Sequence, residues 1–257
     1  MGVVICKIVL GVLVCFTGTC VFSFLNVIIY RLPRKLSFVK GFSICPSCGQ
    51  RLGAGDLLPI FSYVFLRGRC RYCKALIGVR DTLVEGLGGA AALLCVFKYG
   101  CSVTALTVFA FLSVLTVVAF LDIDTMEIED GCWIAVVILS MVSVFTMPGL
   151  HIWERLIGAV CVSVPMLLLT IVIPGAFGGG DIKLMAACGL FLGWKLTLVS
   201  MAAAILIGGL YGCYVLAAKK LERKDHFAFG PFLCMGMVLG LFTGARIIDW
   251  YLGFLLY

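Results

Sequence analysis

The stretch VTALTVFAFLSVLTVVAFL, from Val103 to Leu121, contains no charged side chain and ends directly before Asp122. Its length is close to the roughly 20 apolar residues that a helix needs to cross a bilayer. A helix is the expected structure, because lipid offers no partner to a loose backbone N–H or C=O group. The segment therefore predicts a membrane-spanning helix with an acidic residue at its end.

The composition of the whole chain agrees with a membrane protein. The 257 residues are 63% hydrophobic and 13% charged, whereas a soluble domain is about half apolar and about a quarter charged. The net charge of +7 does not indicate nucleic-acid binding, because the basic residues gather between apolar segments, where they set topology. We therefore expect membrane lipid around the chain and no nucleic acid as a partner.

Apolar segments similar to 103–121 recur along the chain and predict an all-α integral membrane protein with about eight transmembrane helices. Three of these segments are short and contain Gly or Ala, as in helices that neighbouring helices shield. The expected spans are 3–29, 83–97, 103–121, 133–145, 156–173, 182–193, 196–217 and 232–256. The predicted division is a first helix at 1–30, a loop at 31–82 and a transmembrane core at 83–257.

The basic residues predict the orientation, because loops retained in the cytoplasm are enriched in Lys and Arg. The loop at 31–82 is therefore expected in the cytoplasm, as is the loop at 219–226. Counting spans places the loops at 122–130 and 174–181 on the same side. The basic residues of the two basic loops are Arg31, Arg34, Lys35, Lys40, Arg51, Arg67, Arg69, Arg71, Lys74, Arg80, Lys219, Lys220, Arg223 and Lys224.

Two C-x-x-C pairs in the first loop predict a metal site. The pairs are Cys45 with Cys48 and Cys70 with Cys73, and four thiolates at such spacing bind Zn²⁺ tetrahedrally. A disulfide is the alternative, but the cytoplasm is reducing. Four cysteine ligands leave no open position for a catalytic water. We therefore interpret the zinc as structural, supplying folding free energy to a loop with little core of its own.

Two carboxylates are candidate catalytic groups. Asp122 ends the span at 103–121, Asp181 precedes the span at 182–193, and both are expected at the same membrane face. The alternative is that each is a solvated helix cap. If the two carboxylates share one site, they cannot both ionise cheaply, so one keeps a proton and the other acts as a base. Such a pair can activate water against a peptide carbonyl.

Three glycines before Asp181 favour a site that receives an extended peptide. Gly178, Gly179 and Gly180 carry no side chain, so a substrate backbone can approach closely. We therefore predict that these glycines bind substrate. A helix beginning at residue 182 would also direct its positive dipole end toward the Asp181 carboxylate.

Several motifs together resemble those of the type IV prepilin peptidases, and the resemblance covers almost the whole chain. The sequence Gly178-x-Gly180-Asp181 matches the G-x-G-D motif of membrane-embedded aspartic peptidases. Other stretches follow in the order of that family: FLNVIIYRLP at 24–33, CPSCG at 45–49, LPIFSY at 58–63, RGRCRYC at 67–73, LVE at 83–85 and FGPFL at 229–233.

The resemblance implies an aspartic endopeptidase of the bacterial inner membrane that removes the basic leader from type IV prepilin or pseudopilin precursors. In the family, the stretch that begins with the first catalytic aspartate ends in Ile or Leu, then Pro and Asp. When Ile128 and Asp130 are matched to that end, Asp122 takes the place of the first catalytic aspartate, the partner of Asp181. This chain carries Glu129 where the family commonly has proline, so Asp124 stays as an alternative.

Two further readings accompany this interpretation. Many relatives also N-methylate the new N-terminus with S-adenosylmethionine, an activity that only the resemblance implies here, because the sequence contains no nucleotide-binding fingerprint. The alternative function is a small transporter or membrane scaffold with a zinc-stapled loop. Transporters place ionisable residues near the bilayer midplane, whereas the spans expected here are almost free of charge.

Overall fold

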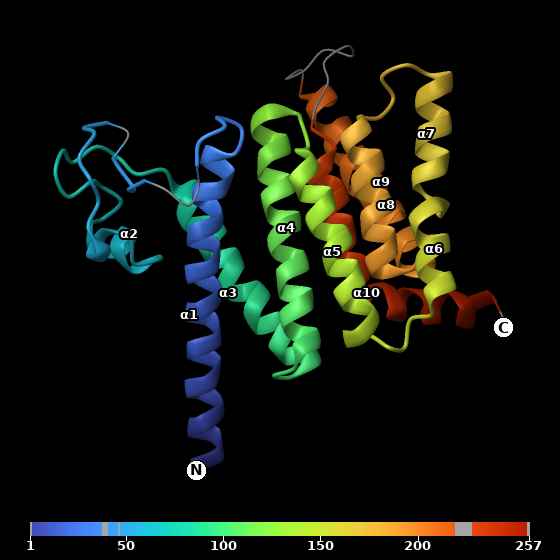
Figure 1. The fold of residues 1–257 in the computed structure, drawn as a ribbon, viewed down its shortest axis with the longest axis horizontal. Helices are drawn as coiled ribbons and strands as arrows, with labels where there is room; N and C mark the ends of the chain where they lie inside the picture. The colour runs from blue at the N-terminus through green and yellow to red at the C-terminus, as the bar shows by residue number, and fades with distance from the viewer. Residues whose placement is uncertain (1, 38–40, 46, 219–227, 256–257) are drawn as a thin grey trace. The chain divides into compact units, whose positions relative to one another are not determined.

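The computed structural model describes residues 2–37, 41–45, 47–218 and 228–255 and consists of helices joined by loops (Figure 1). Within these ranges, the pairing of extended backbone is limited to two isolated antiparallel bridges, Ile44 with Arg51 and Arg69 with Leu76. The expected all-α class is confirmed. Lys40 and the basic residues expected at 219–224 lie outside the described residues.

The chain forms two compact units, Met1–Phe109 and Ala110–Tyr257, and α4 crosses from one to the other. The first unit also contains the cysteine segment, and the second contains both candidate aspartates. The helices are α1 (Gly2–Arg31), η1 (Ala54–Asp56), α2 (Phe61–Phe65), α3 (Val79–Tyr99), α4 (Val103–Thr125), α5 (Asp130–Thr146), α6 (Ile152–Cys161), α7 (Ser163–Val172), α8 (Gly179–Leu192), α9 (Trp194–Ala217) and α10 (Gly230–Leu255).

Six helices of the described chain are long and apolar enough to cross a membrane, so the protein is a multi-pass membrane protein. They are Val4–Arg31, Val79–Tyr99, Val103–Thr125, Ile152–Val172, Trp194–Ala217 and Gly230–Phe254. The expected number of eight is not confirmed, because α5 and α8 have only 17 and 14 residues. A 14-residue helix covers about 21 Å, less than the roughly 30 Å of a hydrocarbon core.

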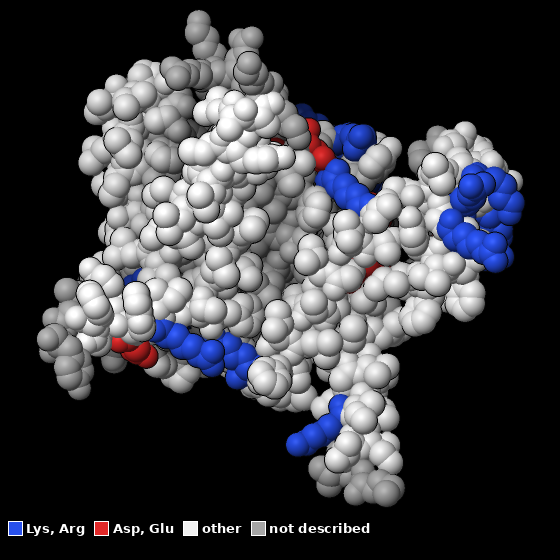
Figure 2. Space-filling model, turned by 180° about the vertical axis from the view of Figure 1, so that it is seen from behind, with Lys and Arg blue, Asp and Glu red and all other residues white. Residues whose placement is uncertain are grey.

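The protein surface is largely apolar. Figure 2 shows one face on which Lys, Arg, Asp and Glu gather in a few patches, while other residues form most of the surface. Many large apolar side chains are exposed, among them Val12, Leu106 and Leu210 at 63%, 66% and 72%. Such extensive apolar exposure is unusual for a soluble monomer and suits contact with lipid.

In the first unit, α1 packs against α3 through small residues. The backbones at Gly18 and Gly88 approach so closely that a Cβ at either position would overlap the other backbone, and Phe22 covers Gly88. Small residues of this kind let helices in lipid pack closely through backbone contact.

The helical segment 152–172 is broken between α6 and α7 at Val162. Pro165 explains the break, because it has no N–H to bond the carbonyl of Cys161 and its ring crowds that turn. The two halves together have the length of one span.

Arg155 of α6 holds the C-terminal ends of α5 and α8 together. Its side chain is 1% exposed, and the guanidinium donates to Leu190 O at 3.1 Å, Ser143 O at 3.0 Å and Met147 O at 3.3 Å, and also to the Ser143 hydroxyl. The last carbonyls of a helix lack intrahelical donors. Arg155 supplies that donor to Leu190 O near the end of α8, and at the end of α5 it adds a second donor to Ser143 O and Met147 O, which also accept the N–H groups of Met147 and Leu150.

We expect Arg155→Met to lower the thermal stability of the purified protein. The buried Leu190 carbonyl loses its donor, at a cost of about 1–3 kcal/mol, and the other bonds of the guanidinium are lost as well. Relief from burying a charge offsets part of that cost. A net loss of about 2 kcal/mol in the free energy of unfolding lowers the midpoint of thermal unfolding by about 4–8 °C in a chain of this size. The control is Arg246→Met, because Arg246 is exposed on α10. Equal midpoints for the two variants would contradict this role of Arg155.

Candidate functional site

Asp122 lies in the last turn of α4 and is held by the first residue of α10. The residue is 6% exposed, and its Oδ2 accepts a hydrogen bond of 2.8 Å from the Gly230 N–H. A helix N-terminus presents free N–H groups and a positive dipole end, both of which stabilise a negative charge. The fold therefore gives Asp122 a buried position in which its carboxylate is stabilised.

Gly230 is required by this contact. A Cβ at residue 230 would lie 2.6 Å from Asp122 Oδ2, closer than the two atoms can approach without displacement. Pro231 follows at the second position of α10, where helices tolerate proline. The segment FGPFL at 229–233 thus gives α10 a start that exposes its first N–H to a carboxylate.

Asp181 is the third residue of α8. Its Oδ2 accepts a bond of 3.3 Å from the Gly178 N–H, while its Oδ1 is buried and has no partner among the described residues. Asp181 lies outside the six candidate spans. Burial is the main reason why the pKa of the Asp181 carboxyl is raised to about 6, and the negative charge of Asp122 is the second.

Contacts between the α4–α5 segment and the first turn of α8 bring the two aspartates together. A Cβ on Gly180 would lie 2.8 Å from the Ile128 Cβ, so the glycine lets the two backbones meet. Lys183 Nζ donates to Asp130 Oδ1 at 2.8 Å, and the Trp133 indole donates to the same oxygen at 2.7 Å. The first turns of α5 and α8 are therefore tied to each other beside the carboxylates.

Aromatic packing joins α8 to α10 at the same end. The rings of Phe177 and Phe229, each directly before a glycine, have centroids 5.9 Å apart. At the end of α4, Asp122 is buried, whereas Asp124, the alternative catalytic residue, is exposed. Two carboxylates close enough to influence each other's ionisation can hold one proton between them and act as general acid and general base.

The three glycines differ in their surroundings. Gly178 and Gly179 are exposed, and a Cβ on Gly179 would meet no atom within 4 Å. A Cβ on Gly178 would instead lie 3.2 Å from Asp181 Oδ2, and the space that a Cβ on Gly180 would need is filled by Ile128. The open backbone beside Asp181 is therefore at Gly179.

The four loop cysteines converge and could hold a metal ion. The Sγ atoms of Cys45, Cys48, Cys70 and Cys73 all lie within 4.8 Å of one another. Cys45 and Cys73 have their Sγ atoms 3.8 Å apart, too far for a disulfide and close to the roughly 3.8 Å edge of a tetrahedron with Zn–S bonds of about 2.3 Å. All the cysteines of the chain are free thiols.

The two C-x-x-C pairs form similar turns. In each, the N–H of the first cysteine donates to the carbonyl five residues later, Gln50 or Ala75, at 2.9 and 2.8 Å. The residue after the second cysteine has positive φ, +70° at Gly49 and +61° at Lys74. Backbone N–H groups of Cys48 and Ser47 lower the pKa of the Cys45 thiol to about 6. Such turns direct both sulfur atoms to one side, and the first turn favours a thiolate at Cys45.

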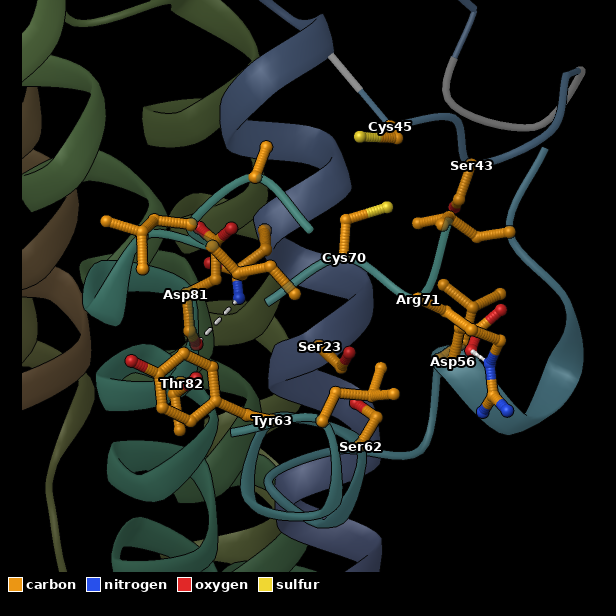
Figure 3. Close-up of a pocket in the computed structure, with 18 of the residues that line it drawn as sticks. Ser23, Ser43, Cys45, Asp56, Ser62, Tyr63, Cys70, Arg71, Asp81 and Thr82 are labelled. Carbon is orange, nitrogen blue, oxygen red and sulfur yellow. Dashed lines mark hydrogen bonds and ion pairs between the residues drawn. The ribbon is translucent and has the colours of Figure 1, made fainter. Parts of the chain in front are cut away.

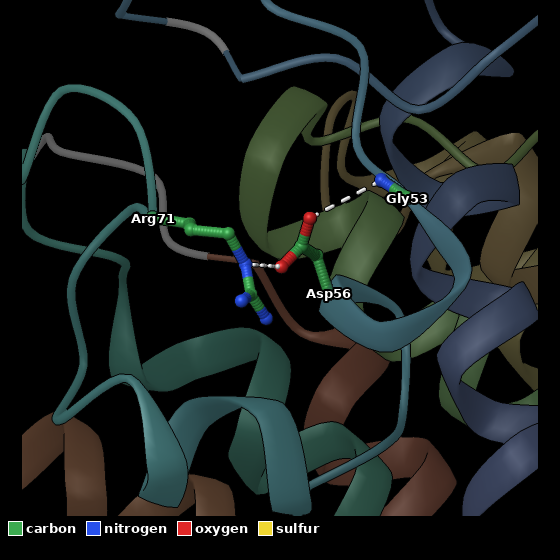
Figure 4. Close-up of polar contacts among 3 residues, drawn as sticks. All are labelled: Gly53, Asp56 and Arg71. Atoms are coloured by element: carbon green, nitrogen blue, oxygen red, sulfur yellow. Dashed lines mark hydrogen bonds and ion pairs between the residues drawn. The ribbon is translucent and has the colours of Figure 1, made fainter.

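A cavity of about 310 Å³ lies beside this cluster in the first unit (Figure 3). Cys45 and Cys70 line it, together with residues of α1, α2 and α3. Near its edge, Asp56 Oδ1 accepts a bond of 2.6 Å from Arg71 Nε, and Asp56 Oδ2 accepts one of 3.2 Å from the Gly53 N–H (Figure 4). The Arg71 guanidinium lowers the pKa of the Asp56 carboxyl, so this ion pair ties the second cysteine turn to η1.

Sequence reasoning missed three of these features. It assigned no role to Arg155, which the structure buries. It did not identify Gly230 as the partner of Asp122, although a Gly-Pro pair at the start of an apolar segment was a usable signal. The bond between Lys183 and Asp130 joins separate helices and leaves no local pattern in the sequence.

Comparison with known proteins gives consistent matches over most of the chain. Residues 16–99 match the model of the bacterial peptidase A24 N-terminal domain, and residues 109–213 match that of the type IV leader peptidase family.

Among curated relatives, the prepilin leader peptidase/N-methyltransferase of Bacillus subtilis (strain 168) is 28% identical, and the alignment covers 86% of this chain and 90% of the relative. Proteins of the same name are 29% identical in Pseudomonas putida, over 90% of this chain and 89% of the relative, and in Neisseria gonorrhoeae, over 91% and 92%. No solved structure matches the chain significantly.

The neighbouring glycines allow a matched test of the contact that brings the aspartates together. We expect Gly180→Ala to destabilise the protein by about 1–3 kcal/mol, because the added methyl group overlaps Ile128 in a packed site. Gly179→Ala adds the same methyl group to open space and is expected to leave stability unchanged or slightly raised. Thermal midpoints of both variants in detergent measure the difference. A Gly179→Ala midpoint as low as that of Gly180→Ala would contradict the described packing.

Proposed function

The chain belongs to the type IV leader peptidase family, and from this premise we propose that it is an aspartic endopeptidase which removes the basic leader from type IV prepilin or pseudopilin precursors. The observation that carries the proposal is a pair of aspartates distant in sequence: Asp122, at the end of α4 and bonded to the start of α10, and Asp181, in the first turn of α8, whose ionisation the Asp122 charge opposes. The names of the relatives support the same substrate class. The bacterial inner membrane is the proposed location, with the pair at its cytoplasmic face.

We assign the shared proton of the resting site to Asp181. Both carboxylates accept one backbone N–H, Asp122 from Gly230 at 2.8 Å and Asp181 from Gly178 at 3.3 Å. Asp181 also has a buried Oδ1 without a partner among the described residues and a pKa raised to about 6 by burial and by the Asp122 charge. In the proposed reaction, Asp122 takes a proton from water as the water oxygen bonds to the scissile carbonyl carbon. Asp181 donates its proton to the carbonyl oxygen. The amide C–N bond then breaks as the leaving nitrogen receives the proton held by Asp122, and Asp181 recovers its proton from the hydroxyl group of the intermediate as the carbonyl re-forms.

The proposed position of the substrate follows from its own chemistry. A pilin precursor has a basic leader followed by an apolar helix, so it would lie in the membrane with the junction at the surface. The exposed backbone of Gly178 and Gly179 beside Asp181 would receive the extended residues around the scissile bond. Gly180, which contacts Ile128, would keep α8 against the α4–α5 segment.

We further propose that the cysteine cluster binds one structural zinc ion. Four sulfur donors at tetrahedral separation suit Zn²⁺, and a closed four-sulfur site has no position for substrate. The metal would replace an extended core in the segment 31–82, which we propose as a distinct cytoplasmic loop between the first helix and the transmembrane core at 83–257. Thiolate bonds of this kind contribute directly to folding.

The second proposed activity is N-methylation of the new N-terminus with S-adenosylmethionine. Its support is the name shared by the relatives, each of which is a prepilin leader peptidase/N-methyltransferase. The methyl donor would supply an electrophilic methyl group on positively charged sulfur.

We expect Asp122→Asn and Asp181→Asn each to slow cleavage of a pilin-like precursor by about 100- to 10,000-fold, the usual contribution of a general acid or base. The amide keeps the size of the side chain but cannot exchange the proton. Conversion of purified precursor to the shorter mature form, followed by gel mobility, gives the rate. Asp124→Asn is the matched control and should cleave at nearly the wild-type rate. Normal cleavage by either dyad variant, or loss of cleavage in the control, would overturn the assignment.

Metal analysis of the purified chain tests the cysteine site. The expected result is one zinc ion per chain for the wild type and less than half of that for Cys48→Ser, because three sulfur ligands hold zinc more weakly. Cys101→Ser, which removes an exposed cysteine outside the cluster, should keep the full content. Unchanged zinc in Cys48→Ser would refute a four-cysteine site.

A further inference from the structure

A cavity in the second unit lies at the C-terminal end of α8, apart from the candidate aspartates. Its volume of about 370 Å³ falls in the range of roughly 300–1,000 Å³ that small-molecule sites occupy. Leu192, the last residue of α8, lines it together with residues of the α5–α6 loop, α6, α9 and α10. Asp181 is in the first turn of α8, at the opposite end of the same helix. Peptide-bond cleavage therefore gives this cavity no role.

The helices that enclose this cavity start or end there, which places it at the level of the lipid headgroups. α6 begins at Ile152, α9 begins at Trp194 and α10 ends at Leu255, at or next to the ends of three candidate membrane spans. Tryptophan is enriched at this level of a bilayer. Trp153 and Trp250, each next in sequence to a lining residue, are 71% and 72% exposed. A headgroup at the membrane surface can therefore reach the cavity.

One face of α10 forms a wall of the cavity. Ala245, Ile248, Asp249 and Leu252 line it, and this spacing of three and four residues puts them on the same side of a helix. In Figure 1, the last turns of α10 run sideways toward the C-terminus. A helix that lies along the membrane surface buries an apolar face in lipid and keeps its polar groups at the headgroups. α10 thus brings an acidic side chain to the cavity at headgroup level.

The lining carries charges of both signs. Glu154, Asp249 and Lys195 contribute to it, and Lys195 is the one basic residue among those that line it. Lys195 Nζ lies 3.8 Å from Glu154 Oε1, too far for a hydrogen bond. Glu154 Oε2 accepts the His151 N–H at 3.2 Å, which fixes that carboxylate. Asp249 has no ion-pair partner among the described residues. A ligand can therefore use two carboxylates and one ammonium group.

We propose that this cavity binds the phosphoethanolamine headgroup of a membrane phospholipid. Its primary ammonium group donates to the Asp249 and Glu154 carboxylates, and its phosphate pairs with Lys195. A two-carbon link joins the two charges of this headgroup, which matches the close placement of opposite charges in the lining. The two carboxylates disfavour a headgroup with negative charge alone. A choline headgroup keeps the positive charge but has no N–H to donate.

A headgroup bound in this way joins helices that are far apart in the sequence. Glu154 belongs to α6, Lys195 to α9 and Asp249 to α10, so one lipid contacts three helices at once. A ligand that binds the folded protein alone raises its stability in proportion to the logarithm of the ligand concentration. The lipid should therefore stabilise the second unit from the end that lies away from the aspartates.

The test is thermal unfolding of the purified full-length protein in detergent, titrated with phospholipids that carry identical oleoyl chains. Phosphatidylethanolamine should raise the midpoint by about 5–10 °C at a concentration 100 times the dissociation constant. Phosphatidylcholine and phosphatidylglycerol should raise it much less. Phosphatidylethanolamine with one, two and three N-methyl groups should bind progressively more weakly, because each methyl group replaces an N–H donor while the charge stays.

Substitutions in the lining separate the headgroup from the lipid chains. Asp249→Asn and Lys195→Gln should each bind phosphatidylethanolamine about tenfold more weakly. Arg246→Gln is the matched control, because Arg246 is exposed on α10 and is not among the lining residues, and it should bind as the wild type does. The midpoint of each variant without added lipid is its own reference, so a less stable variant is not mistaken for a weaker binder.

Three results would overturn the proposal. The first is an equal rise of the midpoint with all three headgroups, which would mean that the lipid chains alone stabilise the protein. The second is an unchanged response to phosphatidylethanolamine in both Asp249→Asn and Lys195→Gln. The third is a stronger response to phosphatidylglycerol, which would make the cavity a site for anionic lipid. Soluble O-phosphoethanolamine should compete only at far higher concentration, and competition at equal concentration would contradict a membrane source for the ligand.

Discussion

Buried carbonyl groups at the ends of two short helices set the main constraint on this structure. In lipid, such groups have no water to bond, so a helix that ends inside a bundle needs a donor from elsewhere in the protein. Arg155 is that donor for Leu190 O of α8, it adds a second donor to two carbonyls at the end of α5, and every acceptor it bonds is neutral. With their C-terminal ends fixed in this way, the length of each helix determines where its first turn lies. The first turn of α8 contains Asp181, so a residue far from the carboxylates helps to set their position.

At the N-terminal ends of α8 and α10, the same arrangement of a carboxylate and a helix start occurs twice. Asp122 bonds the first N–H of α10, and Asp181 lies in the first turn of α8, so each carboxylate sits where a helix presents positive potential. Glycine permits both arrangements, at Gly230 because Asp122 touches it and at Gly180 because Ile128 does. The two carboxylates can therefore be buried near each other, and the mutual repulsion that remains favours a single proton shared by the pair.

The sequence predicts those features that depend on local spacing. The C-x-x-C pairs predict the cluster of four cysteines, which could hold a metal ion, because a two-residue spacing determines the turn that directs both sulfur atoms. The long apolar runs give the helices that can cross a membrane. The number of spans is harder to predict, because α5 and α8 look apolar but are too short, and their ends are satisfied by another helix. The same reason explains Arg155 and Gly230, whose importance arises from partners distant in the sequence.

The two units differ in the groups that surround their carboxylates. In the second unit, each candidate carboxylate meets a backbone N–H of a helix start, and the Asp130 carboxylate is paired with Lys183. That environment suits a neutral peptide bond as the substrate. Cleavage of such a bond requires the carboxylates to exchange protons with it and does not require them to bind a charge. In the first unit, the cavity keeps two carboxylates without a basic partner among the residues that line it, and such a surface attracts a cation.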